Sequence, residues 1–246
     1  KERRMGWLLW TGCSLVALGP PTVIFFLRIV QQAHLVLLAI LSAFCWICAM
    51  AVVGLLWYLM TPIQEAYVFF VIFAALAQEA LRYGFFRLCV RAERGLAVIA
   101  SQRLFSPRNF SSVLASGLGV SYAYVFVMNG SMLALSSGQG TYYSDACDSL
   151  SIFAVSAINC LFFVFLQLAF TILAFGGYAE GSFKKPGFVC AAHLAAALTS
   201  LANLLPNGCV PSLSCLFVIC LIVGGVAVHH TYHQALLAYD LTSRRR

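Results

Sequence analysis

Apolar residues along the chain gather in seven long runs, separated by short stretches that carry polar residues, glycine or proline. Each run is close to the ~20 residues that an α-helix needs to cross ~30 Å of hydrocarbon. The pattern therefore predicts an all-α polytopic membrane protein, a seven-transmembrane helical bundle. The predicted spans are residues 6–27, 33–60, 65–90, 113–135, 150–176, 187–205 and 212–233.

Composition agrees with this pattern. Of the 246 residues, 62% are apolar and 9% are charged, and the mean hydropathy is +0.91. So few polar side chains are too few to cover a soluble globule of this length. No connection is long enough for a soluble domain, so we expect one bundle over residues 6–235. We interpret residues 1–5 as an upstream extension and residues 236–246 as a short basic cytosolic tail.

Lysine and arginine are distributed unevenly between the predicted loops. If the chain crosses the membrane at each apolar run, three of the fifteen basic residues fall on one side and twelve on the other. The loops around Pro62, from Ser136 to Ser149, and around Pro206 carry none. By the positive-inside rule, we expect an extracytoplasmic N-terminus and a cytosolic C-terminus. The twelve are Arg28, Arg82, Arg87, Arg91, Arg94, Arg103, Arg108, Lys184, Lys185, Arg244, Arg245 and Arg246.

The net charge of +7 also bears on the partners of the chain. In a soluble domain such an excess would suggest nucleic acid, but here the cations flank apolar spans. They are placed to meet anionic lipid headgroups at the cytosolic surface. We therefore expect membrane lipids as partners, and not nucleic acid.

Most of the ten cysteines lie within predicted spans, where a thiol behaves as a small hydrophobic group. Cys147 and Cys209 fall in or beside two loops on the extracytoplasmic side, where oxidising conditions allow a disulfide to persist. The sequence leaves open whether their Cα atoms come within the ~7 Å that a bridge needs.

Ionisable residues at membrane depth are candidates for function, because placing them there is costly. Glu79 lies in the third predicted span, and Arg82 and Tyr83 follow three and four residues later on the same helical face. One interpretation is an intrahelical ion pair that eases the cytosolic end of this helix into the interface. The other is a role in binding a ligand or partner. The sequence favours the first.

Gln167 and His193 lie in the fifth and sixth predicted spans, at depths that differ by only ~5 Å at 1.5 Å per residue. We expect them to be able to form a hydrogen bond across two adjacent antiparallel helices, worth ~0.6 kcal/mol. A proton relay would need a carboxylate beside them, and the sequence suggests none.

Two histidines near the C-terminus, His229 and His233, have the i, i+4 spacing that lets two imidazoles face one metal ion. A zinc site needs a third or fourth ligand, and the glutamate of a His-Glu-x-x-His motif is absent. A partly solvated helix end is the favoured interpretation. We predict neither a metal site nor a cofactor.

Small residues form a patch in the fourth predicted span. Gly117 and Ser121 are four residues apart, and Ala115 and Gly119 widen the patch. Such a pattern lets another helix approach closely and pack by van der Waals contact. This patch is the predicted packing seam.

Residues needed for intramembrane catalysis are missing. The three aspartates, Asp145, Asp148 and Asp240, all lie in predicted loops or the tail, so they cannot form an aspartyl protease pair in the membrane. No Gly-x-Ser-x-Gly motif offers a serine nucleophile. No lysine lies in a span where it could form a Schiff base. The chain is predicted not to be an enzyme.

Several stretches share residues with one known family. They are Gly12-Cys13-Ser14-Leu15-Val16-Ala17-Leu18-Gly19-Pro20; Phe44-Cys45-Trp46 with Trp57; Gln78-Glu79-Ala80-Leu81-Arg82-Tyr83 and its continuation through Phe86, Arg87, Ala92, Glu93, Gly95, Leu96 and Ala97; Ser116-Gly117-Leu118; and His193-Leu194. In these stretches the chain resembles the anterior-pharynx-defective family, the seven-helix scaffold subunit of gamma-secretase. The resemblance runs from Met5 to about Gly225 and is strongest in the first hundred residues.

The resemblance implies a non-catalytic scaffold that holds the single helix of nicastrin and docks presenilin, whose C-terminal end enters a cavity between these helices. It also implies the presenilin-enhancer subunit as a partner, a part in Notch signalling, and a location from the endoplasmic reticulum and Golgi to the plasma membrane and endosomes. Gly117 and Ser121 match the small residues of the family's fourth span, and His193 matches its sixth-span histidine. Gln167 stands where the family has a fifth-span histidine, and it keeps a hydrogen-bonding role.

Two other classes of membrane protein remain open. A seven-helix receptor is disfavoured because the last span lacks Asn-Pro-x-x-Tyr and because no acid precedes Arg82 in Leu81-Arg82-Tyr83. A small transporter would need broken helices and paired intramembrane charges. Pro20 and Pro21 offer such a break in one span only.

Overall fold

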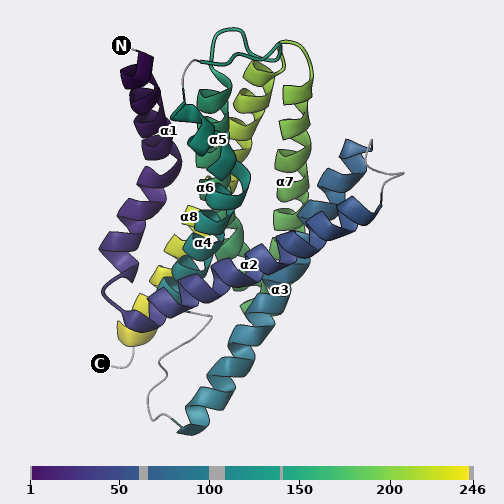
Figure 1. Cartoon of the computed structure of the whole chain (residues 1–246). Helices are drawn as coiled ribbons and strands as arrows, with labels where there is room; N and C mark the ends of the chain where they lie inside the picture. The colour runs from purple at the N-terminus through teal and green to yellow at the C-terminus, as the bar shows by residue number, and fades with distance from the viewer. Residues whose placement is uncertain (1, 61–65, 100–108, 139–140, 244–246) are drawn as a thin grey trace.

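The computed structural model describes residues 2–60, 66–99, 109–138 and 141–243 (Figure 1). The loop around Pro62, the cations Lys1, Arg103 and Arg108, and the tail from Arg244 to Arg246 lie outside the described residues, so the part of the charge argument that uses them stays a prediction. No strand occurs in the described ranges. The elements are α1 (Glu2–Ile24), η1 (Phe25–Ile29), α2 (Ala33–Leu59), α3 (Tyr67–Ile99), α4 (Phe110–Tyr124), η3 (Val125–Asn129), α5 (Gly130–Ser136), α6 (Ile152–Glu180), α7 (Lys184–Ser200), η4 (Leu201–Leu204) and α8 (Cys209–Ser243).

The helices confirm the predicted all-α, seven-span fold class. Seven segments in the described ranges are long and apolar enough to cross a membrane. The third and the last helices differ most from their predictions, since α3 continues to Ile99 and α8 to Ser243. The segments are Gly6–Ile29, Ala33–Leu59, Tyr67–Gly95, Phe110–Ser136, Ile152–Glu180, Lys184–Leu204 and Cys209–Leu236.

The first and fourth segments each contain one wider, π-helical turn, η1 and η3. Helix α1 runs through Pro20 and Pro21 without ending, and η1 follows it directly. Proline cannot donate the backbone hydrogen bond of a regular helix, so α1 is locally weakened at this point. The helix stays continuous, and the break that a transporter interpretation would use does not occur here.

Helix α6 lies at the centre of the bundle (Figure 1). It contacts α1, α3, α4, α7 and α8, and most of its residues are buried within the protein. Both of the larger apolar clusters include α6 side chains, among them Val164 and Phe175 in one and Leu166 and Phe170 in the other. The remaining helices therefore assemble around this one.

Helix α4 lies between α2 and α6 because small residues line both of its faces. Gly119 faces α2 so closely that an added Cβ would lie 2.0 Å from the carbonyl oxygen of Ala39. Ser42 Oγ in turn donates to Ser116 O at 2.9 Å. Short side chains thus allow α2 to cross the bundle in direct backbone contact with α4 (Figure 1).

Candidate functional site

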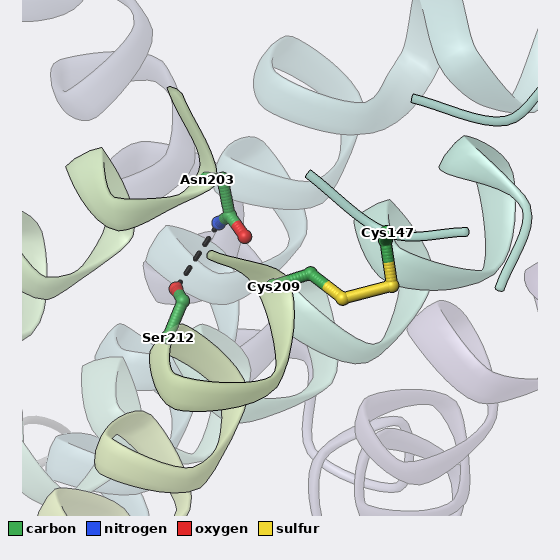
Figure 2. The surroundings of a disulfide bond; sticks show 4 residues. All are labelled: Cys147, Asn203, Cys209 and Ser212. Atoms are coloured by element: carbon green, nitrogen blue, oxygen red, sulfur yellow. Dashed lines mark hydrogen bonds between the residues drawn. A yellow bond between two sulfur atoms is a disulfide. The ribbon is translucent and has the colours of Figure 1, made fainter. Parts of the chain in front are cut away.

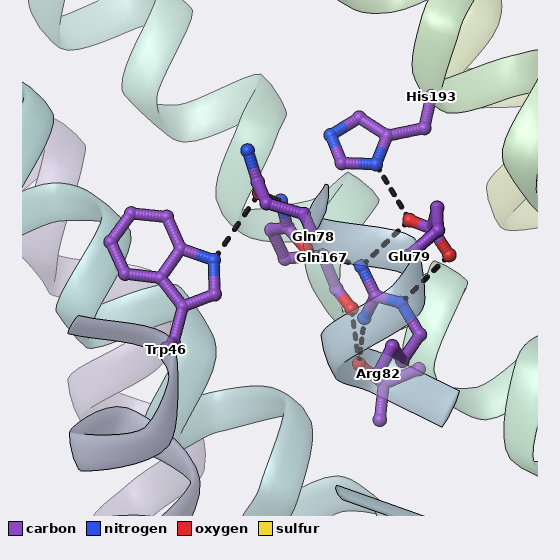
Figure 3. A network of polar contacts seen from close by, with 7 residues as sticks. Trp46, Gln78, Glu79, Arg82, Gln167 and His193 are labelled. Carbon is purple, nitrogen blue, oxygen red and sulfur yellow. Dashed lines mark hydrogen bonds and ion pairs between the residues drawn. The ribbon is translucent and has the colours of Figure 1, made fainter. Parts of the chain in front are cut away.

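A network of polar side chains lies buried where α2, α3, α6 and α7 approach one another (Figure 3). Its members come from four helices, so no single stretch of sequence contains it. Each is at most 9% exposed. The members are Trp46 from α2, Gln78, Glu79 and Arg82 from α3, Gln167 and Thr171 from α6, and His193 from α7.

Arg82 has the most contacts in this network. Its Nε donates to Glu79 Oε2 at 3.1 Å and its Nη2 donates to Glu79 Oε1 at 3.2 Å, so the predicted pair on α3 forms. The guanidinium also reaches α6, where Nη2 donates to Gln167 Oε1 at 2.7 Å and Nη1 donates to Thr171 Oγ1 at 2.6 Å. Arg82 therefore ties α3 to α6 as well as to its own helix, and its side chain points into the bundle.

His193 contacts the same carboxylate from the opposite side. Its Nδ1 lies 2.6 Å from Glu79 Oε1, and because an ionised carboxylate only accepts, Nδ1 carries the proton of this bond. The imidazole ring lies 5.1 Å from the ring of Phe170, centroid to centroid. Glu79 therefore joins α3 to α7, while Arg82 joins α3 to α6.

Gln78 extends the network towards α2. Its Oε1 accepts from Trp46 Nε1 at 3.2 Å and from Gln167 Nε2 at 3.2 Å. Thr171, which accepts from Arg82, donates to the carbonyl oxygen of Gln167 at 2.8 Å. The side-chain amide oxygens of Gln78 and Gln167 thus each accept a hydrogen bond from a neighbouring helix. A buried polar group that is hydrogen-bonded in this way avoids the free-energy cost of an unpaired one.

The polar groups of this network bind helices to one another. One carboxylate and one guanidinium balance each other, and several hydrogen bonds hold them, which a charge pair out of water requires. No group of three or more His, Cys, Asp or Glu side chains converges on a metal-binding geometry within the described residues. The arrangement fixes how α2, α3, α6 and α7 lie relative to one another.

Three sequence-based interpretations need correction. Glu79 and Arg82 do not ease a helix end into the lipid interface, because both side chains are buried between helices. The structure does not pair Gln167 with His193, because Gln167 bonds to Arg82 and Gln78 while His193 bonds to Glu79. The expectation that no carboxylate lies beside His193 is also wrong, because Glu79 from α3 reaches it. Equal depth on two neighbouring helices does not decide which side chains meet, since Arg82 and Glu79 of a third helix, α3, bind Gln167 and His193 instead.

The predicted packing seam is filled by the chain's own helices. A Cβ added at Gly117 would lie 3.2 Å from a side-chain carbon of Leu168 and 3.4 Å from Cβ of Thr171. Ser121 is fully buried, and its Oγ donates to Val164 O at 3.2 Å as well as to Gly117 O at 2.9 Å. Gly117 and Ser121 thus pack against α6, and any effect of theirs on a partner is transmitted through the bundle.

Cys147 and Cys209, for which the sequence left a bridge open, form a disulfide with a Cα–Cα distance of 5.4 Å (Figure 2). The bridge ties the connection after α5 to the start of α8. Two backbone bonds run beside it, from Asn207 N to Asp145 O and from Cys209 N to Ala146 O, both at 3.0 Å. The bridge closes one end of the bundle and lies apart from the polar network.

The C-terminal histidines also lie apart from the network. His229 and His233 are exposed on α8. His230, between them, accepts from Lys185 Nζ at 3.2 Å, and the same ammonium group donates to both carboxylate oxygens of Glu180 at 2.7 Å. This cluster joins α7 and α8 at the end of the bundle where α6 finishes.

A small pocket lies beside the network, between α2, α3, α4 and α6. Apolar side chains such as Val120 and Phe175 form most of its wall, and Arg82, Gln78 and Ser42 contribute polar atoms. It is a hollow between packed helices that offers apolar contact next to a charged group.

Sequence reasoning missed Thr171, Gln78 and Trp46 as members of the site. Two signals were available. Thr171 follows Gln167 by four residues, which places both on one face of α6, and Gln78 directly precedes Glu79. Trp46 gave no such signal, because its partner lies on another helix.

Comparisons with known proteins give one consistent result. The family model described as "Aph-1 protein" matches residues 8–234. The gamma-secretase subunit APH1-like of Arabidopsis thaliana is 31% identical over 216 residues, covering 85% of this chain and 86% of the relative. The gamma-secretase subunit Aph-1 of Drosophila melanogaster is 28% identical over 192 residues, covering 78% and 80%. The gamma-secretase subunit APH-1B of Homo sapiens is 25% identical over 223 residues, covering 87% and 84%.

Proposed function

We infer from these matches that this chain, which belongs to the Aph-1 family, is a subunit of gamma-secretase and serves the complex as a non-catalytic scaffold. The match over nearly the whole length of the chain carries this conclusion. The physical reading agrees with it, since the buried polar groups join helices to one another. Membership of this family argues against a receptor and against a transporter.

The partners follow from the family resemblance. We propose that the chain packs against the single helix of nicastrin and against presenilin, and that the presenilin-enhancer subunit belongs to the same assembly. The pocket between α2, α3, α4 and α6 is where we propose that the C-terminal end of presenilin enters. Its largely apolar wall suits a chain terminus with apolar side chains.

The scaffold residues act in this proposal by holding the shape of the bundle. Glu79, Arg82, Gln167 and His193 set the relative positions of α3, α6 and α7, and Gly117 and Ser121 set the distance between α4 and α6. None of these residues needs to touch a partner to affect assembly. A change in any of them alters the surface that a partner meets.

The orientation of the chain is part of the proposal. We propose an extracytoplasmic N-terminus and a cytosolic C-terminus, in a chain that passes from the endoplasmic reticulum and Golgi to the plasma membrane and endosomes and takes part in Notch signalling. The two ends of the described chain lie at opposite ends of the bundle (Figure 1). Lys184 and Lys185 lie at the end where α8 finishes, and the connection between α5 and α6 at the other end has no basic residue.

Two measurements test these statements. Affinity capture of the tagged full chain from membranes, followed by mass spectrometry, should recover presenilin and nicastrin, while capture of a heterotrimeric G protein alone would overturn the scaffold. For orientation, Tyr143→Cys should react with a membrane-impermeant maleimide on intact cells. Phe183→Cys is the matched control, since Phe183 is 88% exposed in the connection between α6 and α7, and it should react only after permeabilisation. The reverse labelling pattern would show that the orientation of the chain is the opposite of the one proposed.

A further inference from the structure

The part of α3 that extends beyond residue 86 carries an arginine stripe, formed by Arg87, Arg91 and Arg94. Their spacings of four and three residues place all three within about 60° of one another around the helix. All three are exposed. Figure 1 shows this part of α3 projecting past the other helices at the end of the bundle where α8 finishes. The stripe therefore faces the surroundings along its whole length.

The charges of the stripe are not neutralised by the protein as described. Arg91 and Arg94 have no hydrogen bond or ion pair with any described residue. Arg87 Nη1 donates to Tyr83 OH at 2.8 Å and lies over the ring of Tyr83, which keeps its charge and fixes its position. Lys185, at the same end of the bundle, is instead paired with Glu180. The stripe thus offers three cations without a carboxylate.

The depth of the stripe follows from the polar network. Glu79 and His193 touch, so they lie at one level, and Lys184 begins α7 nine residues before His193. The same rise of about 13 Å along α3 from Glu79 ends beside Arg87. Measured along the axis of α3, which runs obliquely to α7 in Figure 1, Arg91 and Arg94 lie a further ~6 Å and ~10 Å from Arg87, so they lie outward of it by at most these distances. The headgroup region of one leaflet is roughly 5–7 Å thick, so the stripe is long enough to extend through it.

We propose that the arginine stripe binds the headgroup of a polyphosphorylated inositol lipid in the cytosolic leaflet, an inference that rests on the proposed orientation of the chain. The phosphodiester of such a lipid lies at the level of Arg87, and the ring phosphates extend outward to Arg91 and Arg94. Guanidinium groups bind phosphate oxygens in pairs of parallel hydrogen bonds. A headgroup with one phosphate reaches only the first arginine. A soluble acidic peptide would leave the membrane-level end of the stripe unused.

Binding of dioctanoyl phosphatidylinositol bisphosphate to the detergent-purified full chain, together with whatever subunits co-purify, tests the proposal. At about 1 kcal/mol per basic residue, the double variant Arg91→Gln/Arg94→Gln should bind on the order of 30-fold more weakly. Arg91→Lys/Arg94→Lys keeps the charge but loses the paired hydrogen bonds, so its affinity should lie between those of the unchanged chain and the glutamine variant. Arg28→Gln/Lys184→Gln is the matched control, because it removes two exposed cations from the same end outside the stripe, and it should bind within threefold of the unchanged chain.

Several results would overturn the proposal. One is equal affinity of the unchanged chain and the Arg91→Gln/Arg94→Gln variant. A second is an equal loss of affinity in the Arg28→Gln/Lys184→Gln control, which would mean that any cations at this end of the bundle bind the lipid and that the stripe has no special role. Dioctanoyl phosphatidylserine that binds as tightly would contradict the need for several phosphates. Free inositol trisphosphate or a decaglutamate peptide that binds as tightly would point to a soluble metabolite or an acidic protein. Maleimide labelling tests the orientation separately, so failure of either idea can be recognised.

Discussion

Replacing Gly119 by alanine should separate α2 from α4. The added Cβ would lie 2.0 Å from Ala39 O, 2.1 Å from Ser42 Oγ and 2.8 Å from Ala39 C. Two of these atoms belong to the backbone of α2 and cannot rotate away. Relief of the contact needs a shift of α2 by more than about 1 Å, because non-bonded heavy atoms settle near 3.5 Å.

The cost of this shift has two parts. Overpacking of a well-packed interface costs about 1–3 kcal/mol. The bond from Ser42 Oγ to Ser116 O, now 2.9 Å, would stretch out of range and lose ~0.6 kcal/mol. The higher helix propensity of alanine offsets up to ~1 kcal/mol of this cost. We therefore expect the free energy of unfolding to fall by about 1–3 kcal/mol, and capture of presenilin to fall with it.

Unfolding of the purified chain by sodium dodecyl sulfate, followed by tryptophan fluorescence, measures this loss. Gly84→Ala is the matched control, because nothing lies within 4 Å of a Cβ added on α3 at that position. Gly117→Ala should fall between the two, since its nearest contact is a side-chain atom of Leu168 at 3.2 Å. If Gly119→Ala and Gly84→Ala unfold at the same detergent fraction, the close approach of α2 and α4 is wrong.

Three further changes test other parts of the molecule. Glu79→Gln leaves the Arg82 charge without its partner and should cost about 3–5 kcal/mol in unfolding free energy, whereas Glu79→Leu combined with Arg82→Leu should cost less than Glu79→Gln alone. Equal losses in the single and double variants would contradict a buried ion pair. Gln167→Leu removes the acceptor of one Arg82 N–H bond and one of the two donors to Gln78 Oε1, and it should cost about 1–3 kcal/mol. Gln167→His can both donate and accept and should cost less in the same assay. Cys147→Ser should lower the unfolding free energy by up to about 2–4 kcal/mol, with Cys215→Ser, a free and exposed cysteine, as the unaffected control. A Cys147→Ser chain that migrates and unfolds as the unchanged chain does would argue against the bridge.

The number and place of the spans could be predicted from the sequence because lipid imposes a simple rule. Every backbone group in the hydrocarbon must be satisfied within its own helix, so each apolar run of about 20 residues becomes one helix. The pairing of Glu79 with Arg82 was equally accessible, since both lie on one helix three residues apart. Local spacing decides such features.

Which side chains meet across helices could not be predicted in the same way. In a soluble protein the apolar face of a helix marks its buried side, but lipid tails are as apolar as a protein core. Exposed Phe73 and buried Phe85 on α3 therefore give no contrast in the sequence. The rotation of α3 that brings Glu79 to His193 is set by its contacts with α2, α6 and α7, and the sequence of α3 alone does not contain that information.

The same physics limits how this chain can recognise its partners. Its buried polar groups are largely turned inward, where Arg82 alone contacts three other side chains. A partner helix therefore meets mainly apolar side chains such as those of α2 and α3, which lipid covers equally well. Selectivity must come from the shape of that surface, because burial in itself gains nothing over lipid. The shape depends on the crossing of α2 over α4 and on the ties from α3 to α6 and α7. The polar network thus contributes to recognition by keeping a lipid-facing surface rigid.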